Sequence, residues 1–367
     1  MSINSVLTGH AEGFTLPSKL MSTAPDARFA QQTEGLTRTV TVHSFPDADL
    51  ERAWRAFLLT ADFPTHYVSP EYFREPFFAG KRQFAVLALK GSTVAGVITG
   101  MHEGHHLICG VSGRPQVALS PSAGSDVFAS LLSALRAEAG SSTLISVFSW
   151  VALPAFRDDG FTEREIDAIV MLDLKLGRDA LFKGFNKGRK SDINFAARKG
   201  VEVRLTNSDA DFNAYYEIYS KWCDRKKIER QTIETMRAAF GLESNRVLFM
   251  AFHEGVAIAG SVVRYVASGI AEYSANNSVE EALPLRPNSL LNWIAIQWAI
   301  DQGLRGYSMG GSHPFLRHFG GDVLPIYRYR IDLSLFKRHE RREQLEANAR
   351  TVARALRQRF RSTRDGQ

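Results

Sequence analysis

The 367-residue sequence predicts an α/β (α+β) protein made of two tandem copies of one domain, and three observations support this prediction. The length suits about two domains of ordinary size. Apolar residues make up 44 % and charged residues 23 % of the chain, which is enough apolar material for two cores. Similar segments also recur at an offset that stays close to 163 residues, which indicates an internal duplication.

The repeat begins with the string DADL at Asp47–Leu50, which returns as DADF at Asp209–Phe212, 162 positions later. Each string follows a short apolar segment and is expected to open a helix. Gly96 and Gly260, which are 164 positions apart, each follow a pair of predicted strands joined at a lone glycine.

The rest of each copy is predicted as a meander of antiparallel strands, then a helix, then a short strand. One face of each meander is expected to be buried against helices, which gives a mixed sheet. The paired strands are Phe84–Leu89 and Val247–Phe252, Val97–His102 and Val262–Val266, His106–Val111 and Ala271–Asn276, and Leu144–Ser149 and Arg305–Met309; the paired helices are Asp126–Ala139 and Ser289–Gln302.

Five segments follow from this pattern. Residues 1–37 are rich in Ser, Thr, Gly and Pro and are expected to be flexible. Residues 38–165 and 201–335 are predicted as the two domains, and 166–200 as a connecting strand and a basic helix. Residues 336–367 are predicted as a basic amphipathic helix.

The positive charge is concentrated in this last segment. From Lys337 onward there are ten Lys/Arg and four Asp/Glu, so the tail carries the whole formal charge of +6. Its apolar residues share one helical face, namely Leu345, Ala349, Val352, Leu356 and Phe360. Packing on the protein's own domain and contact with an anionic membrane or a nucleic acid are both consistent with this pattern.

A second basic cluster spans Lys183 to Arg204, within a helix expected from about Asp179 to Lys199. Its charges fall on more than one face of that helix. The cluster is typical of a solvated connector, and binding of a phosphate-bearing substrate is the alternative.

Several classes of site are disfavoured. The sequence shows no secretory signal pattern and no apolar run long enough for a membrane span, so a cytoplasmic protein is expected. Cys109 and Cys223 lack metal-ligand spacing. His102, Glu103, His105 and His106 resemble a ligand set but fall on a predicted hairpin turn that the second copy builds without histidine, so no metal site is expected.

The strongest chemical signal lies between residues 304 and 330. A strand runs into Gly310-Gly311, where backbone N–H groups could bind an oxyanion or a phosphate. His313 and His318 bracket the next loop and are suited to proton transfer near neutral pH. A purely structural loop, with a histidine stacked on Phe315, is the alternative.

The segment FNKGRKSDINFAARKGVEV, the duplicated domain and the later F-x-x-x-F-G-G pattern together resemble the Fem-type transferases. Those proteins consist of two tandem GNAT-like domains. They include enzymes that transfer amino acids from aminoacyl-tRNA to peptidoglycan precursors, and relatives that use acyl-CoA. The resemblance covers roughly residues 40–335.

The resemblance implies a set of site residues. Lys187 and Arg189 would line the entrance between the domains, and Arg317, Phe319 and Gly320 would close a loop over the substrate. The groove of the second copy would be formed by Tyr273, Asn276, Ser308, Gly310 and Gly311. Family members commonly have a lysine where this chain has Leu316, so Arg317 or His318 would have to replace its charge.

The chemistry expected is direct acyl transfer to an amine or hydroxyl. His313 would be the base, the N–H groups near Gly310-Gly311 the oxyanion donors, and Tyr273 the acid for the leaving group. Arg286 is a candidate phosphate contact, with Asn288 or Ser289 as a helix cap.

No bound cofactor is expected, and acyl-CoA is the favoured co-substrate. The acceptor would be a saccharide or a cell-envelope precursor, at the inner face of the membrane if the tail binds lipid. Three alternatives remain. They are a tRNA-dependent aminoacyltransferase, a non-catalytic module that binds a phosphorylated glycan or a lipid-linked precursor, and a peripheral membrane scaffold held by the C-terminal segment.

Overall fold

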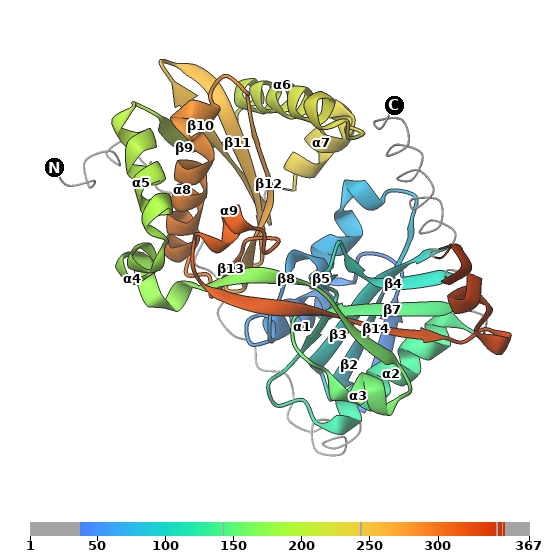
Figure 1. The fold of residues 1–367 in the computed structure, drawn as a ribbon. Coiled ribbons are helices and arrows are strands. Elements are labelled where there is room, and N and C mark those ends of the chain that lie inside the picture. Colours follow the sequence, from blue (N-terminus) through green and yellow to red (C-terminus); the bar gives the residue numbers. More distant parts are fainter. Residues whose placement is uncertain (1–36, 142, 243, 343, 347, 349–367) are drawn as a thin grey trace, which may run out of the picture. The chain divides into compact units, whose positions relative to one another are not determined.

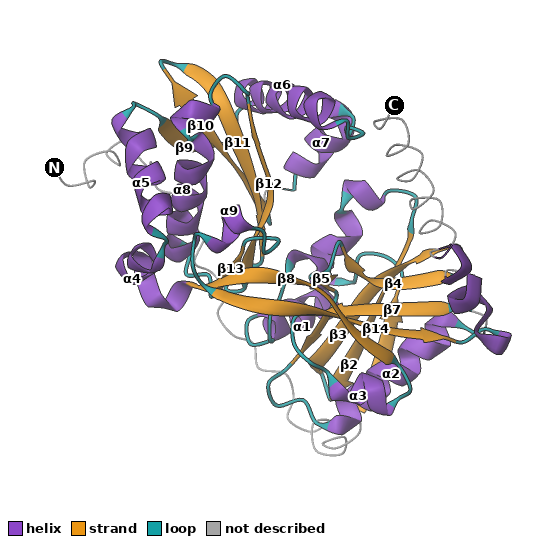
Figure 2. Cartoon of the chain, in the orientation of Figure 1, coloured by secondary structure: helices purple, strands orange, loops and turns teal. Residues whose placement is uncertain are grey.

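The computed structural model describes residues 37–348 except 142, 243, 343 and 347 (Figures 1 and 2). The first copy comprises β1 (Thr37–Val42), α1 (Ala48–Leu58), β2 (Arg82–Lys90), β3 (Thr93–Glu103), β4 (His106–Val111), β5 (Arg114–Pro115), β6 (Val117–Leu119), α2 (Ser125–Ala139) and β7 (Leu144–Ser149). The second comprises β9 (Glu202–Thr206), α6 (Asp209–Lys226), α7 (Ile233–Phe240), β10 (Arg246–His253), β11 (Val256–Tyr265), β12 (Ile270–Ser278), α8 (Pro287–Asp301) and β13 (Gly306–Ser308). The predicted repeat of strand, helix, meander, helix and strand is therefore present twice.

Two long strands join the copies into one mixed sheet. These are β8 (Thr162–Asp173), which follows the short helix α3 (Pro154–Asp158), and β14 (Asp322–Asp332), which follows α9 (Pro314–Arg317). The strand order is β1-β2-β3-β4-β7-β14-β8-β13-β12-β11-β10-β9, with β5 and β6 paired beside this path. Each copy therefore receives a strand from the other: β14 lies between β7 and β8, and β8 lies between β14 and β13. The predicted domain boundary at residues 165 and 166 falls inside β8.

The central strands form because both of their faces are covered by apolar groups. On β2, Phe84, Val86 and Ala88 pack in the cluster that includes α2, whereas the alternate residues Ala85, Leu87 and Leu89 pack in the cluster that includes α1. This gives a continuous apolar run instead of alternation, as expected for a strand between two helical layers.

The second copy repeats this arrangement. Leu248 and Met250 of β10 pack with α6, while Phe249 and Ala251 pack with α8. Figure 1 shows α6 and α8 on opposite sides of β10, β11 and β12. The sheet of each copy is thus a middle layer, and the site residues lie where its strands separate.

The basic segment corrects one prediction. In place of a single helix over residues 179–199 there are two, α4 (Gly177–Gly184) and α5 (Lys187–Arg198). Phe185 is buried in extended conformation between them, and the Asn186 carboxamide accepts the Gly188 N–H at 2.7 Å as an N-cap. Burial of Phe185 against Trp293 and Phe319 explains the break.

The predicted basic C-terminal helix begins after a short turn, η7 (Leu335–Lys337), and is helical at the described positions between 338 and 348. Its predicted apolar face lies largely outside the described residues, since only Leu345 is among them. Within the described part of the chain, every helix is too short or too polar to cross a bilayer.

Candidate functional site

The second copy opens between β12 and β13. These strands pair in parallel only from Ile270 to Glu272, opposite Gly306 to Ser308. Beyond Glu272 the β12 strand continues to Ser278 without β13 beside it, so one edge of its backbone faces the opening. Such an edge presents N–H and C=O groups to a ligand.

A β-bulge lies at this edge. On β11, Val262 pairs with Ala275 and the next residue, Val263, pairs with Tyr273, so Ser274 is the extra residue. A bulge leaves its extra residue outside the hydrogen-bond ladder. The backbone of Ser274 is therefore available to an incoming carbonyl oxygen, and its hydroxyl accepts and donates no hydrogen bond among the described residues.

Tyr273, Ser308 and Gly310, three of the predicted groove residues, meet at the base of the opening. Gly310 has φ +73°, and a methyl group added to it would lie 2.9 Å from the Tyr273 carbonyl oxygen. Its N–H donates to the Ser308 hydroxyl at 3.2 Å, and the Gly311 carbonyl accepts from Val170 N–H at 3.0 Å. Because the Gly310 N–H is already engaged, the bulge is better placed than Gly310 to supply an oxyanion donor.

Two ionisable side chains directly precede the bulge on β12. Burial raises the pKa of the Tyr273 hydroxyl, so this group stays protonated at neutral pH. Burial also raises the pKa of Glu272, whose side chain is fully buried. Arg114 of the first copy pairs with Glu272 at 3.1 Å, although its N–H is not aligned for a hydrogen bond.

Asn276, the remaining predicted groove residue, lies further along β12. Its side-chain oxygen and nitrogen are both buried, and neither forms a hydrogen bond with a described residue. An unsatisfied buried amide is costly, so a polar ligand group at this position would stabilise the site.

A buried charged cluster joins the segment after α1 to the second copy. Glu75 accepts from His66 Nε2 at 2.8 Å and from Arg246 at 2.9 Å, and Arg264 lies 3.9 Å away and donates to Tyr67. Asn245 bonds to His66 Nδ1 at 2.9 Å, which places the ring proton on Nε2. Burial lowers the pKa of His66 to about 4, while His66 and the two arginines hold the pKa of Glu75 well below its usual range against the opposing effect of burial.

A cavity of about 160 Å³ adjoins this cluster and the bulge. It combines aromatic rings with the Arg246 and Arg264 side chains, and Ser274 and Ala275 form its β12 wall. The other lining residues are Phe77, Tyr215, Tyr219, Gln231, Met236, Ala239, Phe240 and Val262. The cavity is suited to a small polar molecule that has an anionic group and a face able to stack on a ring.

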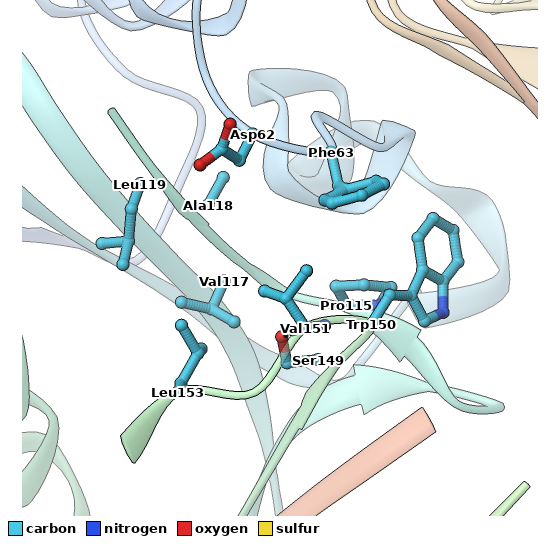
Figure 3. A pocket seen from close by; sticks show the side chains of 10 residues that line it. All are labelled: Asp62, Phe63, Pro115, Val117, Ala118, Leu119, Ser149, Trp150, Val151 and Leu153. Carbon is cyan, nitrogen blue, oxygen red and sulfur yellow. Dashed lines mark hydrogen bonds between the residues drawn. The ribbon is translucent and has the colours of Figure 1, made fainter. Parts of the chain in front are cut away.

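The first copy also opens, between β6 and the end of β7, but its cavity measures only about 40 Å³ (Figure 3). Phe63 and Trp150 lie at one end, with ring centroids 6.2 Å apart, and Phe63 has φ +46°. The remaining wall is mostly apolar. This volume admits only a few water-sized groups.

The loop before α2 in the first copy is poorly suited to a phosphate. The Asp126 carboxylate lies 2.5 Å from where a Cβ on Gly124 would be, and hydrogen bonds from Thr37 and Lys90 lower its pKa. A negative charge at the helix N-terminus opposes the binding of a second anion.

In the corresponding loop of the second copy, the predicted helix N-cap, Asn288 or Ser289, was wrong. The N-cap of α8 is Arg286, in left-handed conformation, followed by Pro287 at the first helical position. Neither Asn288 nor Ser289 caps the helix: Ser289 accepts from Arg189, and Asn288 approaches Ser278. Arg286 is exposed and pairs with Asp192 of α5.

The predicted loop over the substrate forms α9 and its flanks. His313 is exposed at the N-cap of α9, with its ring stacked 6.2 Å from Phe315, and His318 is exposed at the C-cap. Arg317 is exposed and donates to Ser312. Leu316, at the family's lysine position, is buried in the apolar core of the second copy, so no charge is present there.

Arg189 is buried and does not line an open surface. Its guanidinium donates to the Phe315 carbonyl at 2.8 Å and to Ser289, and lies 3.9 Å from the centre of the Phe315 ring. Lys187, two residues earlier, is exposed. Phe319 is buried, and Gly320 approaches the Gly184 carbonyl. Arg189 therefore fixes α9 against α8.

The histidine-rich turn between β3 and β4 binds other protein groups. His102 contacts Glu138 at 2.8 Å, His106 contacts Ser146 at 2.8 Å, and His105 stacks on His339. Within the described residues, no group of three or more His, Cys, Asp or Glu side chains is placed to hold a metal ion.

Glu272, Arg114, Arg264 and Glu75 are absent from the set predicted from the sequence. All four lie in strands or short turns, where charged residues ordinarily face solvent. The sequence held a signal for only one of them. Glu272 stands next to the predicted groove residue Tyr273, on the last strand of the meander before α8.

Comparison with known proteins supports the fold. Residues 183–320 match the model for an acetyltransferase (GNAT) domain, and no curated protein matches the chain. Among solved structures, FemX has 12 % identity and a TM-score of 0.64, with 80 % of this chain and 97 % of FemX covered.

Two further similar structures are a domain of a putative lysylphosphatidylglycerol synthetase and a protein named L-PGS. The C-terminal domain of a putative synthetase from Agrobacterium fabrum has 12 % identity and a TM-score of 0.54, covering 77 % of this chain and 90 % of that domain. The L-PGS structure from Bacillus licheniformis has 14 % identity and a TM-score of 0.53, covering 78 % and 92 %. The chain therefore has the Fem-like fold of tandem GNAT-type units that the sequence predicted, and the residues that match the GNAT model, 183–320, span its second copy.

Proposed function

We propose that the second copy catalyses transfer of an acyl group from a small activated donor, with acyl-CoA favoured, to an amine or hydroxyl. The observation that carries this proposal is the bulge at Ser274, on an open strand edge beside a cavity of about 160 Å³. A donor carbonyl at this edge would receive a backbone N–H, while an acceptor in the cavity approaches the same carbonyl.

The reaction needs one proton removed and one returned. The acceptor nitrogen or oxygen forms a bond to the carbonyl carbon and loses its proton to a base. The tetrahedral oxyanion is stabilised at the bulge, and the carbon–sulfur bond to the leaving thiolate then breaks. The Tyr273 hydroxyl, protonated because its pKa is raised, returns a proton to that thiolate.

Two residues are candidates for the base. His313 is the candidate from the sequence, and it is exposed on α9. Glu272 is favoured by its place two residues before the bulge and by its raised pKa, which brings a carboxylate closer to the value useful near neutral pH. Because Glu272 is fully buried, its action requires that the acceptor reach it from the cavity shared by Arg264 and Ser274.

The cavity suggests the class of acceptor. Arg246 and Arg264 provide positive charge, and Tyr215, Tyr219 and Phe240 provide rings on which a sugar could stack. A saccharide or cell-envelope precursor that carries a carboxylate or phosphate meets these requirements. We propose that the protein acts on it in the cytoplasm.

A second candidate is aminoacyl transfer from aminoacyl-tRNA. It is motivated by the likeness to FemX and to lysylphosphatidylglycerol synthetase domains. The same bulge would receive the ester carbonyl, and the basic residues of α5 and of the C-terminal segment would contact the nucleic acid in a salt-dependent way.

Activity assays of the chain and its variants with each of the two donors distinguish the acyl-CoA reaction from the tRNA reaction. The purified chain is assayed for thiol release from acetyl-CoA and longer acyl-CoAs against a panel of amino sugars, and for amino-acid transfer from charged tRNA. We expect turnover with an acyl-CoA, lowered at least a hundredfold by Tyr273→Phe or by substitution of the base. If Glu272→Gln leaves the rate unchanged and His313→Ala abolishes it, the base is His313. Turnover with charged tRNA alone would reject the acyl-CoA donor.

A further inference from the structure

The turn after β14 presents two large apolar side chains to solvent. Leu335 is 75 % exposed and Phe336 is 72 % exposed, and they are consecutive in the sequence. Among the other exposed large apolar side chains in the described part of the chain, no two are consecutive in the sequence. Scattered single residues of that kind are ordinary, whereas an adjacent pair at a tip indicates an interaction site.

The base of this turn is held firmly. The Asp332 carboxylate, only 6 % exposed, accepts the Ser334 N–H and hydroxyl through one oxygen. Its other oxygen accepts the N–H groups of His339 and Glu340, each at 2.9 Å. One buried carboxylate therefore fixes the two ends of the turn relative to each other, and the stacking of His339 on His105 ties the turn to the first copy.

The tip adopts an unfavourable backbone. Phe336 has φ +56° and Lys337 has φ +51°, both in the left-handed region that residues with a Cβ seldom occupy. Strain of this kind persists only where surrounding contacts impose it.

Basic side chains surround the apolar tip. Lys337, Arg338, Arg341 and Arg342 are all exposed and follow the tip directly, with Glu340 as the acidic residue among them. Arg342 pairs with Glu346, which leaves a net positive rim. These positive charges therefore lie within two helical turns of Leu335 and Phe336.

We propose that the Leu335–Phe336 turn, with its basic rim, inserts into the interface of an anionic lipid bilayer. Two apolar side chains are far too little surface for a stable protein interface, which needs several hundred square ångströms on each partner. They do suit the boundary between headgroups and acyl chains, where the flanking cations meet anionic headgroups. This inference concerns a surface separate from the proposed acyl-transfer site and does not depend on it.

The test is sedimentation of the full chain with vesicles. One set contains phosphatidylcholine alone, and the other contains phosphatidylcholine with 30 % phosphatidylglycerol, about a third anionic lipid. We expect binding to the anionic vesicles that weakens with salt. Replacing both Leu335 and Phe336 by Ser should lower the partition coefficient at least tenfold. Lys337→Gln and Arg338→Gln should each lower it roughly fivefold on anionic vesicles only.

Val256→Ser is the matched control, because Val256 is 64 % exposed at the β10–β11 turn without a basic rim. It should bind vesicles as the unaltered chain does. The proposal is overturned if the unaltered chain does not sediment with anionic vesicles, or if the Leu335/Phe336 variant binds them equally well. It is also overturned if sedimentation equilibrium shows that the pair instead joins two copies of the chain, which the double Ser variant would then separate.

Discussion

Glu75 and Arg246 form a buried ion pair across 171 residues of sequence, with 2.9 Å between the carboxylate oxygen and the guanidinium nitrogen. Each side chain is at most 2 % exposed. Glu75 lies in the turns between α1 and β2, and Arg246 opens β10. The pair therefore connects the first copy to the second beside the proposed acceptor cavity.

Removing the arginine should be strongly destabilising, because it leaves the Glu75 carboxylate buried with fewer partners. We expect Arg246→Met to lower the free energy of unfolding by about 3–5 kcal/mol in urea denaturation. The control is Arg237→Met, which breaks an exposed pair with Asp209 and should cost less than about 1 kcal/mol. Equal effects of the two substitutions would show that the buried pair has no special role.

Acid should weaken the protein through His66. The folded-state pKa of about 4 lies below the ordinary 6.5, so the unfolded chain binds more protons between these values. The resulting stability is fully present above about pH 6.5 and decreases as the pH falls toward 4, by up to about 3 kcal/mol. The depressed pKa of Glu75 acts in the same direction at still lower pH.

Urea unfolding at pH 7.5, 6 and 5 measures this dependence. His66→Gln retains a donor for Glu75 and an acceptor for Asn245 but does not titrate, so its stability should vary much less between pH 7.5 and 5. A variant with an unchanged slope would assign the pH dependence to other groups.

Gly310 should be sensitive to a single added methyl group. Gly310→Ala would place that group 2.9 Å from the Tyr273 carbonyl and force the strand ends apart, so we expect donor binding to fall at least tenfold. Gly303→Ala is the matched control, since Gly303 has φ +66° with no atom near the added group. This variant should lose only about 1 kcal/mol of folding stability, because alanine is disfavoured at positive φ, and should bind the donor normally. Similar loss of binding in both would point to strain alone.

Arg189 should control the order of the α9 segment. Arg189→Leu removes the donors to Ser289 and the Phe315 carbonyl, and we expect a loss of about 3 kcal/mol in stability with faster hydrogen exchange over residues 312–320. Lys187→Leu, at an exposed position of the same helix, should change stability by less than about 0.5 kcal/mol. Unchanged exchange in the Arg189 variant would remove its proposed positioning role.

Much of the fold could be predicted because each copy carries its own local signals. The strings DADL and DADF do open α1 and α6, and the lone glycines do mark the hairpin turns. The exchange of β8 and β14 between the copies could not be predicted from the sequence. Alternation of side chains indicates which faces of a strand are buried but not which strand lies beside it. The break at Phe185 was missed because the helical pattern continues on both sides of it.

The candidate site was predictable in part for a similar reason. The resemblance to the Fem-type transferases pointed to Tyr273 and the glycine pair pointed to Gly310, and the structure brings these two residues together. Glu272 and Arg264 were missed because their strand pattern does not show that the other copy covers them. Leu316 could be recognised as a departure from the family, but only its packing in the core shows that no charge replaces the lysine there.

The central claim is that an acyl donor binds the second copy at the bulge of β12, and a thermal-shift titration with acyl-CoAs tests it most directly. At about 100 times its dissociation constant, a donor should add about 2.7 kcal/mol of stability. The account predicts that Gly310→Ala and Asn276→Leu each reduce this stabilisation to about 1.4 kcal/mol or less, whereas Val151→Trp, which fills the small cavity of the first copy, leaves it intact. A flat response at millimolar acyl-CoA, or a shift lost only in Val151→Trp, would contradict it.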